Sequence, residues 1–203
     1  NLTLGERLKY VADCVRTKGP DYAIAVDAFV SRLEAAQAGS TAPMVGDVMP
    51  DFCLPSHEGR LVTLHSLLDR GPAVLAFHRG HWCHYCRLNM VGLAEIEREA
   101  KPAQIVAISS EVQQYTRMLR AEAGAEFPFL TDVGGGYALS INLAIWVDEA
   151  MSGMIGGTPW VLPVPAVFVV GQDGIIAARH VDPDYRRRME LDALLDAVKL
   201  VSA

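Results

Sequence analysis

The sequence predicts an α/β fold in which a βαβ half is followed by a ββα half. Residues 73–77 (AVLAF) form an unbroken apolar run bounded by a Gly-Pro pair, as expected of a central strand buried on both faces. A helical segment separates this run from a second apolar stretch at residues 104–108 (QIVAI). Residues 166–170 and 174–178 flank a Gln-Asp-Gly turn, which predicts an antiparallel pair. This order of elements is typical of one mixed sheet flanked by helices.

The first 40 residues predict a helical hairpin in front of the sheet. Apolar side chains recur at helical spacing over residues 4–15 behind a Thr3 to Glu6 capping box, and Gly19-Pro20 ends this helix. Residues 22–38 repeat the pattern up to a capping glycine. We expect residues 1–40 to be an extension whose apolar stripe packs on the domain or on a second subunit. The stripe consists of Leu4, Leu8, Val11 and Val15.

Shorter elements are expected between the hairpin and the end of the chain. Linkers and turns rich in glycine and polar residues separate them. The predicted strands lie at residues 51–54 and 61–64, and the predicted helices at residues 66–69, 86–100, 111–123, from 137 onward and around 191–198.

Charge and cysteine content exclude several classes of protein. The chain carries 18 Lys and Arg against 24 Asp and Glu, a net charge of −6, which argues against nucleic-acid and anionic-membrane binding. The longest stretch without a charged residue, residues 151–172, contains too many glycines and prolines for a membrane helix. No leader pattern begins the sequence, and four cysteines are too few for a secreted disulfide scaffold. We therefore expect a cytoplasmic protein.

A CxxC motif carries the chemistry of this sequence. Trp82, Cys83, His84, Tyr85 and Cys86 follow a predicted buried strand and open a predicted helix. The free N–H groups and the dipole of a helix N-terminus favour an anion, so Cys83 is expected to have a lowered pKa and to supply the thiolate. Cys86, one turn later, can attack a mixed disulfide at Cys83. The imidazoles of His84 and of the nearby His81 would stabilise the thiolate when protonated.

Two other interpretations of the motif stay open. The cysteines could be inert buried thiols, although the loop context and Trp82 argue against that. A zinc or copper site is a stronger alternative, because His78 and His81 add nitrogen ligands to those of the CxxC motif. No second CxxC or HxxxH motif completes a closed structural site. A lone CxxC near a βαβ unit favours redox chemistry.

Three segments give the sequence a resemblance to a known family. They are GDVMPDF at residues 46–52, FHRGHWCHYC at residues 77–86 and LPVPAVFVV at residues 162–170. The sequence resembles the alkyl hydroperoxide reductase and thiol-specific antioxidant (AhpC/TSA) family, in its peroxiredoxin-like branch. The resemblance implies a thioredoxin-like domain over residues 44–203. It also implies Cys83 as the nucleophile, Cys86 as the resolving cysteine, and Pro165 as a cis-proline that faces them.

The sequence departs from common peroxiredoxins at three places. Their PxxxTxxC motif is absent, since Ala76 and Gly80 lie seven and three residues before Cys83. Their arginine is absent at Pro165, and His84 replaces a proline of close relatives. The threonine and arginine polarise a peroxide in that family, so their loss moves the expected activity towards thiol–disulfide exchange. Peroxide reduction, as an antioxidant enzyme, is the alternative.

The expected substrate is thus a disulfide or a hydroperoxide, and the expected reductant is a thiol system such as thioredoxin or glutathione. A homodimer is an open possibility. No organic cofactor is expected, because neither a GxGxxG motif nor a P-loop occurs. Arg79 is expected either to guide an anionic substrate to Cys83 or to be a solvated loop residue.

Other residues receive simpler interpretations. Cys14 and Cys53 are expected to be core thiols. The run Arg186-Arg187-Arg188 is expected to be a solvated helix start, with a binding patch as the alternative. Met151, Met154 and Trp160 are expected to fill a loop core, or else to line a substrate groove.

Overall fold

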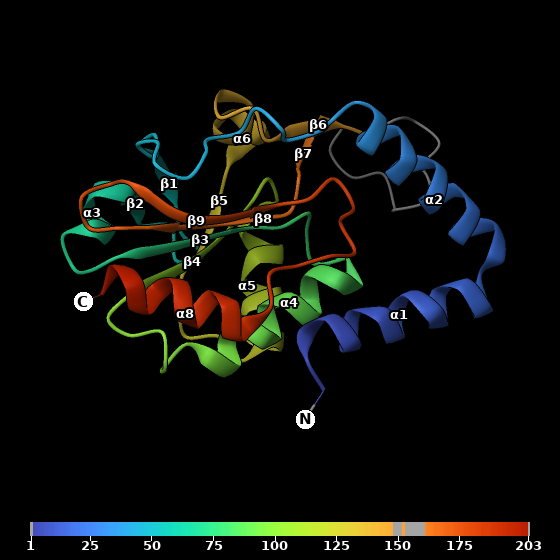
Figure 1. Cartoon of the computed structure of the whole chain (residues 1–203), viewed down its shortest axis with the longest axis horizontal. Helices are drawn as coiled ribbons and strands as arrows, with labels where there is room; N and C mark the ends of the chain where they lie inside the picture. The colour runs from blue at the N-terminus through green and yellow to red at the C-terminus, as the bar shows by residue number, and fades with distance from the viewer. Residues whose placement is uncertain (1, 148–151, 153–160, 203) are drawn as a thin grey trace.

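A five-stranded mixed sheet forms the centre of the protein (Figure 1). The computed structural model describes residues 2–147, 152 and 161–202. The strand order is β5-β4-β3-β8-β9, in which β3, β4 and β5 are parallel and β8 and β9 run antiparallel to their neighbours. This arrangement confirms the predicted α/β fold with one central mixed sheet.

The strands fall into this sheet and two small two-stranded sheets. The sheet of β1 and β2 and that of β6 and β7 are antiparallel. The strands are β1 (Cys53–Pro55), β2 (Leu61–Thr63), β3 (Ala73–Phe77), β4 (Gln104–Ser109), β5 (Phe129–Thr131), β6 (Ala144–Trp146), β7 (Val161–Pro163), β8 (Ala166–Val170) and β9 (Ile176–Val181).

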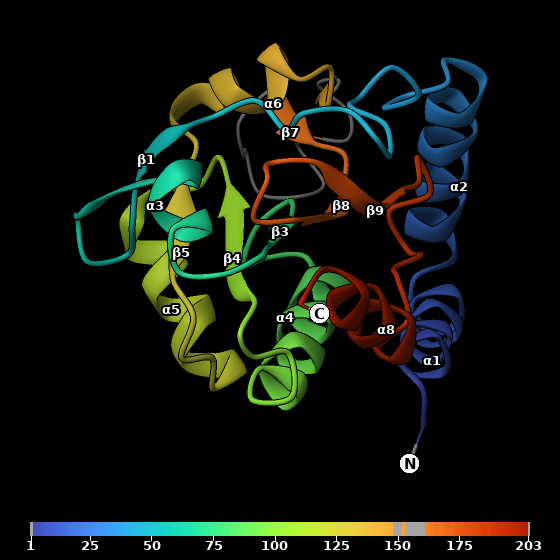
Figure 2. The same ribbon diagram turned by 60° about the vertical axis from the view of Figure 1, so that its left-hand side comes forward.

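Helices cover both faces of the central sheet. Figure 2 shows α4, α5 and α8 grouped along one side of the strands, with α6 on the other. The described α-helices are α1 (Leu4–Lys18), α2 (Pro20–Ala35), α3 (Leu64–Leu68), α4 (His84–Ile96), α5 (Gln113–Ala123), α6 (Gly136–Ser140) and α8 (Leu191–Val201), and a 3₁₀ turn η1 (Val133–Gly135) precedes α6. None of the described helices is both long and apolar enough to cross a bilayer.

The two faces of the central sheet bury separate cores because side chains alternate along each strand. On one face, Val74 and Ala76 of β3 pack with Leu93 of α4 and Leu194 of α8. On the other face, Leu75 and Phe77 belong to a cluster that also includes Phe29 of α2 and Leu67 of α3. With all five residues of β3 buried, the end of this strand is held firmly where the cysteine loop begins.

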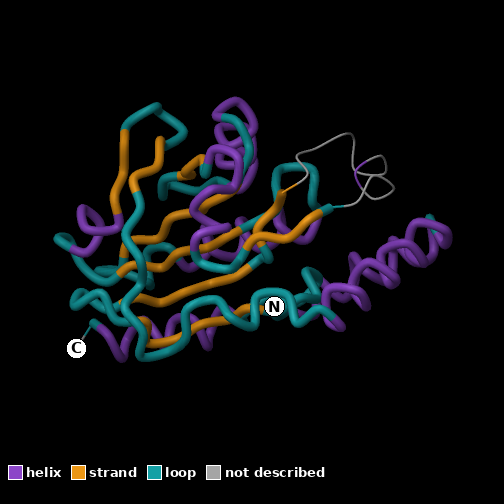
Figure 3. The backbone as a smooth tube through the Cα atoms, turned by 90° about the horizontal axis from the view of Figure 1, so that it is seen from above, coloured by secondary structure: helices purple, strands orange, loops and turns teal. Residues whose placement is uncertain are grey.

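The N-terminal hairpin forms as predicted and packs on its own chain. Thr3 and Glu6 complete the capping box, and Leu4 and Leu8 are buried against the main core. Arg7 joins the hairpin to α4 through an ion pair with Glu95, at 2.9 Å. Figure 3 shows the hairpin as an arm at one side of the sheet.

The sheet of β6 and β7 was not expected from the sequence. Each strand has three residues, and Ala144 pairs with Pro163, Ile145 with Leu162 and Trp146 with Val161. Such short segments lie below the length at which alternation is informative. The sheet matters for the site because β7 leads through Val164 and Pro165 into β8.

Candidate active site

The two cysteines of the CxxC motif lie where the chain passes from the central sheet into α4. Strand β3 ends at Phe77, a loop follows, and Cys83 is the N-cap residue of α4. The side chain of Cys83 is 4% exposed and that of Cys86 is 0% exposed. As predicted, the motif opens a helix after a buried strand, and only Cys83 has any contact with solvent.

Hydrogen-bond donors surround the sulfur of Cys86. The backbone N–H of Arg79 and the Nη2 of Arg188 each lie 3.4 Å from Cys86 Sγ, and the thiol of Cys83 donates a hydrogen bond to it. Burial alone raises the pKa of Cys86, but the Cys83 hydrogen bond and the charges of Arg188 and Arg79 outweigh burial and lower this pKa well below its usual range. Of the two thiols, that of Cys86 therefore loses its proton more readily.

The expectation of a lowered pKa at Cys83 is wrong for the resting dithiol. Burial, followed by the hydrogen bond to Cys86, raises the pKa of Cys83 well above its usual range. Residue 83 does occupy the helix N-cap, but Arg188 and the N–H of Arg79 are directed at Cys86 instead. Two hydrogen-bond donors at one sulfur stabilise a negative charge on Cys86 more than the partial charge of the helix N-terminus stabilises one on Cys83.

Arg79 is buried among aromatic rings next to the cysteines. Its guanidinium carbon lies 3.8 Å from the ring centre of Tyr185, 4.8 Å from that of Trp82 and 5.9 Å from that of Phe29. Burial opposes the charge, whereas Cys83 and Tyr185 raise the pKa of Arg79. The expectation of a solvated loop arginine is therefore wrong, because cation–π contacts replace its water. Its Nε has no hydrogen-bond partner among the described residues.

Arg188 is a site residue that the sequence analysis assigned to a solvated helix start. Its side chain is buried, and besides Cys86 it bonds the backbone carbonyls of Tyr185 and Arg187. Its neighbours behave differently: Arg186 pairs with Asp27 and Asp184, and Arg187 is largely exposed. Three consecutive arginines carry no periodic signal, so nothing in the sequence distinguished the buried one.

His81, in the loop before Cys83, has a partner of its own. Its Nδ1 lies 2.5 Å from Oε1 of the buried Glu111, its backbone N–H donates to Oε2 at 2.8 Å, and its ring stacks on Tyr115 at 4.2 Å. Burial raises the pKa of Glu111, and His81 opposes this. Gly80 makes the contact possible, since a Cβ there would lie 2.7 Å from Glu111 Oε1. These contacts fix the loop that leads to Cys83.

His78 is buried and packs against an aromatic ring. Its ring packs edge-on against Phe129, 5.9 Å between centres, and burial lowers its pKa to about 4. Neither ring nitrogen has a hydrogen-bond partner among the described residues. His81 is engaged by Glu111 instead. Over residues 2–147, 152 and 161–202, no three His, Cys, Asp or Glu side chains gather as they would around a metal ion.

Pro165 is buried beside the start of the cysteine loop. Ala166 pairs with Phe77, so Pro165 and His78 are next to each other at the ends of two neighbouring strands. Lys101–Pro102 is the only cis peptide bond within the described residues, so the expected cis bond before Pro165 is wrong.

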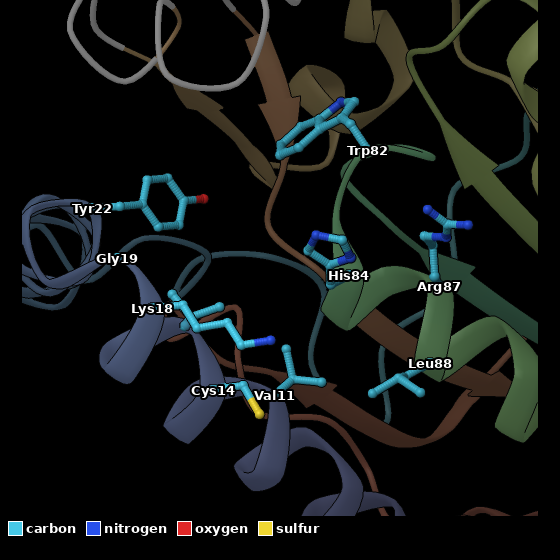
Figure 4. A pocket seen from close by; sticks show the side chains of 10 residues that line it. Val11, Cys14, Lys18, Gly19, Tyr22, Trp82, His84, Arg87 and Leu88 are labelled. Atoms are coloured by element: carbon cyan, nitrogen blue, oxygen red, sulfur yellow. The ribbon is translucent and has the colours of Figure 1, made fainter.

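A groove opens beside the cysteines, between the hairpin and α4 (Figure 4). Its volume is about 810 Å³, and Trp82 and His84, the two neighbours of Cys83, both line it. Tyr22 and Lys18 approach it from the hairpin side. The groove gives the face of α4 next to Cys83 room for a ligand. Met151, Met154 and Trp160 lie outside the described residues.

The other two cysteines are not core thiols. Cys53 is exposed, and Cys14 is half-buried and lines the groove. The expectation for Cys53 fails because it alternates with the buried Leu54 along β1, so that the two side chains point to opposite faces of the small β1–β2 sheet and that of Cys53 is on the exposed face. All four cysteines of the chain are free thiols.

Comparisons with known proteins agree with this architecture. The model of the AhpC/TSA family matches residues 45–179, more than half of the chain. A peroxidoxin, BcpB, of Mycobacterium tuberculosis is 21% identical, with 78% of this chain and 98% of that chain covered and a TM-score of 0.64. A putative protein disulfide isomerase from Bacteroides thetaiotaomicron is 17% identical, with 78% and 90% covered and a TM-score of 0.58.

A third similar structure is a yeast mitochondrial 1-Cys peroxiredoxin, described with a thiol-resolving mechanism via glutathione/thioredoxin systems. It is 15% identical, with 78% of this chain and 77% of that chain covered and a TM-score of 0.61. At these identities the likenesses show the fold, which is thioredoxin-like. No curated protein matches the sequence. By the match over residues 45–179, the chain belongs to the AhpC/TSA family.

Proposed function

We propose that this protein is a thiol–disulfide oxidoreductase that cycles Cys83 and Cys86 between a dithiol and a disulfide. The observation that carries the proposal is the placement of two cysteines one helical turn apart, with Arg188 and the N–H of Arg79 directed at Cys86. Donors of this strength hold a thiolate within reach of the thiol of Cys83 at neutral pH. A buried arginine next to a cysteine sulfur favours ionisation of the thiol, which distinguishes this pair from inert structural thiols.

Cys83 is the nucleophile in this proposal because it alone of the pair contacts solvent. As its sulfur attacks one sulfur of the substrate disulfide, its proton passes to Cys86 along the hydrogen bond that joins them. The substrate S–S bond breaks, a mixed disulfide forms at Cys83, and the leaving thiolate takes a proton from solvent.

Cys86 then resolves the mixed disulfide. Arg188 and Arg79 hold the pKa of Cys86 low, so the thiol readily loses the proton that it received. Its sulfur attacks Cys83 Sγ, the second substrate thiolate leaves with that proton, and the Cys83–Cys86 disulfide forms. Two electrons and one proton have passed from the protein to the substrate, and the second proton has come from solvent. An external dithiol restores the reduced pair in the reverse exchange.

Peroxide reduction is a second candidate, favoured by the arginines. Both Arg79 and Arg188 are buried near the cysteines, and the Nε of each has no hydrogen-bond partner among the described residues. Such donors suit the developing charge of an O–O bond that breaks. Cys83 would attack the terminal oxygen and become a sulfenic acid, an alcohol would leave, and Cys86 would displace water from the sulfenic sulfur.

Partners and location complete the proposal. We assign the reducing role to a thioredoxin or glutathione system, supported by the fold shared with the yeast peroxiredoxin described with those systems. The four free thiols suit the reducing cytoplasm. Trp82, His84 and Arg79 are assigned to substrate contact or activation, since Trp82 and His84 line the groove and Arg79 lies over Trp82. Pro165 is assigned to substrate contact as well, since it lies next to His78 at the start of the cysteine loop.

A paired assay tests the proposal. The reduced protein is given hydroxyethyl disulfide in one cell and hydrogen peroxide in another, and thiol loss is followed in both. Disulfide reduction well above peroxide consumption supports the oxidoreductase. Fast peroxide consumption, at about 10⁴ M⁻¹s⁻¹ or more, with no disulfide reduction, supports the peroxidase instead.

A further inference from the structure

The groove between the hairpin and α4 is lined mainly by apolar side chains, which favours one class of ligand. Val11, Val15 and Leu88 give it an aliphatic floor, and Tyr22 and Trp82 add aromatic surface. None of the described residues that line it is acidic. An apolar site with few polar groups binds an apolar body and orients it through those groups.

Among the described residues that line this groove, Lys18 is a cation with no ion-pair partner in the described part of the chain. Lys18, at the end of α1, reaches across the pocket from the hairpin side in Figure 4. The other cation of the lining, Arg87, is already held by Glu122 at 2.7 Å. Lys18 is thus available to an anionic ligand, and the aliphatic floor lies beside it.

The groove also lies next to the reactive cysteine in the chain. Trp82 and His84 line it and flank Cys83 in the chain. On the hairpin side, burial raises the pKa of Tyr22, and the nearby charge of Cys83 raises it further while Arg79 lowers it, so the Tyr22 hydroxyl lies within electrostatic range of Cys83. A ligand in the groove therefore contacts Lys18 at one wall and the two chain neighbours of Cys83 at another.

We propose that this groove binds a small aliphatic disulfide that carries a carboxylate, with the carboxylate at Lys18 and the disulfide at Cys83. The inference deepens the proposed thiol–disulfide exchange and rests on it. Cys83 attacks one ligand sulfur, Cys86 resolves the mixed disulfide, and the ligand leaves as a dithiol that has gained two electrons and one proton from the enzyme and a second proton from solvent. Charge complementarity with Lys18 argues for the carboxylate. The aliphatic floor argues for an aliphatic chain between the carboxylate and the disulfide.

The test compares lipoate with lipoamide, which share one ring disulfide and one aliphatic chain but differ in the carboxylate. Exchange between the Cys83–Cys86 pair and each compound is followed by stopped flow. Depending on which direction the equilibrium favours, either the reduced protein is mixed with the disulfide compound or the oxidised protein is mixed with the dithiol compound. We expect a preference of about 1.5- to fivefold for lipoate, the range of one exposed charge pair. The preference lies in KM, because Lys18 contacts no reacting atom.

Two substitutions on the same helix make the comparison specific. Lys18→Met removes the free cation and is expected to bring the lipoate to lipoamide ratio close to one. Lys9→Met removes a largely exposed lysine of α1 that pairs with Asp13 instead, and it is expected to leave the ratio unchanged. Exchange with the neutral hydroxyethyl disulfide is expected to be the same in all three proteins.

A binding measurement that needs no turnover separates this inference from the proposed function. Octanoate is expected to release heat on binding to the wild type, weakly or not at all to Lys18→Met, while octanamide binds both proteins equally. Equal rates for lipoate and lipoamide, or a preference that survives in Lys18→Met, would overturn the inference. If octanoate does not bind to the wild type, the inference is overturned too. This holds also where the cause is a second subunit that covers the groove. Failure with hydroxyethyl disulfide would count against the proposed function alone.

Discussion

Replacing Arg188 by glutamine tests the electrostatics of the cysteine pair. Glutamine keeps a long polar side chain but removes the charge whose Nη2 lies 3.4 Å from Cys86 Sγ. A hydrogen bond to a charged partner in a buried site contributes about 1.5–3 kcal/mol. Since 1.4 kcal/mol is a factor of ten, we expect the acid dissociation constant of the Cys86 thiol to fall by about ten- to a hundredfold, which moves its titration up by about one to two pH units.

The thiolate is measured by its ultraviolet absorbance as the pH of the reduced protein is varied. Arg187→Gln is the matched control, because it makes the same chemical change one residue away, on an exposed side chain that pairs with Asp182 and Asp184. The titration of Arg188→Gln should move to higher pH, and that of Arg187→Gln should overlay the wild type. The rate of alkylation by iodoacetamide should fall in step.

An unchanged titration in Arg188→Gln would refute the idea that Arg188 holds the thiolate. Because Arg188 also bonds two backbone carbonyls, its loss can loosen the segment before α8. Arg188→Lys keeps the charge and separates the two effects: it should restore most of the low pKa even if its melting temperature stays below that of the wild type.

Three further predictions concern the cysteines, the buried histidine and the loop. Cys83→Ser should abolish exchange, whereas Cys86→Ser should trap a mixed disulfide at Cys83 by mass spectrometry; adducts on Cys86 of Cys83→Ser at the wild-type rate would contradict the assignment. Burial keeps His78 neutral by lowering its pKa to about 4, so its contribution of up to about 3 kcal/mol is complete above pH 6.5 and is lost as the pH falls towards 4. His78→Leu should therefore show a flatter urea stability profile over that interval, and an equally steep profile would contradict this. Gly80→Ala should lower the free energy of unfolding by about 1–3 kcal/mol and slow exchange, because its φ is 150° and a Cβ would lie 2.6 Å from Trp82 Nε1. Gly46→Ala, with positive φ but no atom within 4 Å, is the control; equal losses in both proteins would show that the contact with the loop is unimportant.

The central sheet was predictable from the sequence because its strands are long enough to show a pattern. The predicted strand at residues 73–77 is β3, and that at residues 104–108 is β4 with one residue more. The capping box at Thr3 likewise places the start of α1. Helix α4 begins at His84, two residues before the predicted start, because a CxxC motif at a helix N-cap has no apolar repeat to mark the boundary.

The candidate site was only partly predictable, because its electrostatics depend on residues far apart in sequence. The CxxC motif identified Cys83 and Cys86, but Arg188 lies 102 residues from the sulfur that it contacts. From the sequence, the position of Cys83 at the N-terminus of a predicted helix was the one argument about ionisation, and it favoured Cys83 as the thiolate. The burial of Arg79 depends on three rings from separate parts of the chain, Phe29, Trp82 and Tyr185. Such contacts follow from tertiary packing, which local patterns do not encode.

The most direct test of the redox cycle is a map of the cysteines after a single turnover. The reduced wild-type protein is mixed with an equimolar amount of hydroxyethyl disulfide, the remaining thiols are alkylated, and the peptides are identified by mass spectrometry. We predict an intramolecular Cys83–Cys86 disulfide, with Cys14 and Cys53 alkylated and the substrate recovered as free thiol. Adducts left on Cys14 or Cys53, with Cys83 and Cys86 still alkylated as free thiols, would contradict the proposed cycle.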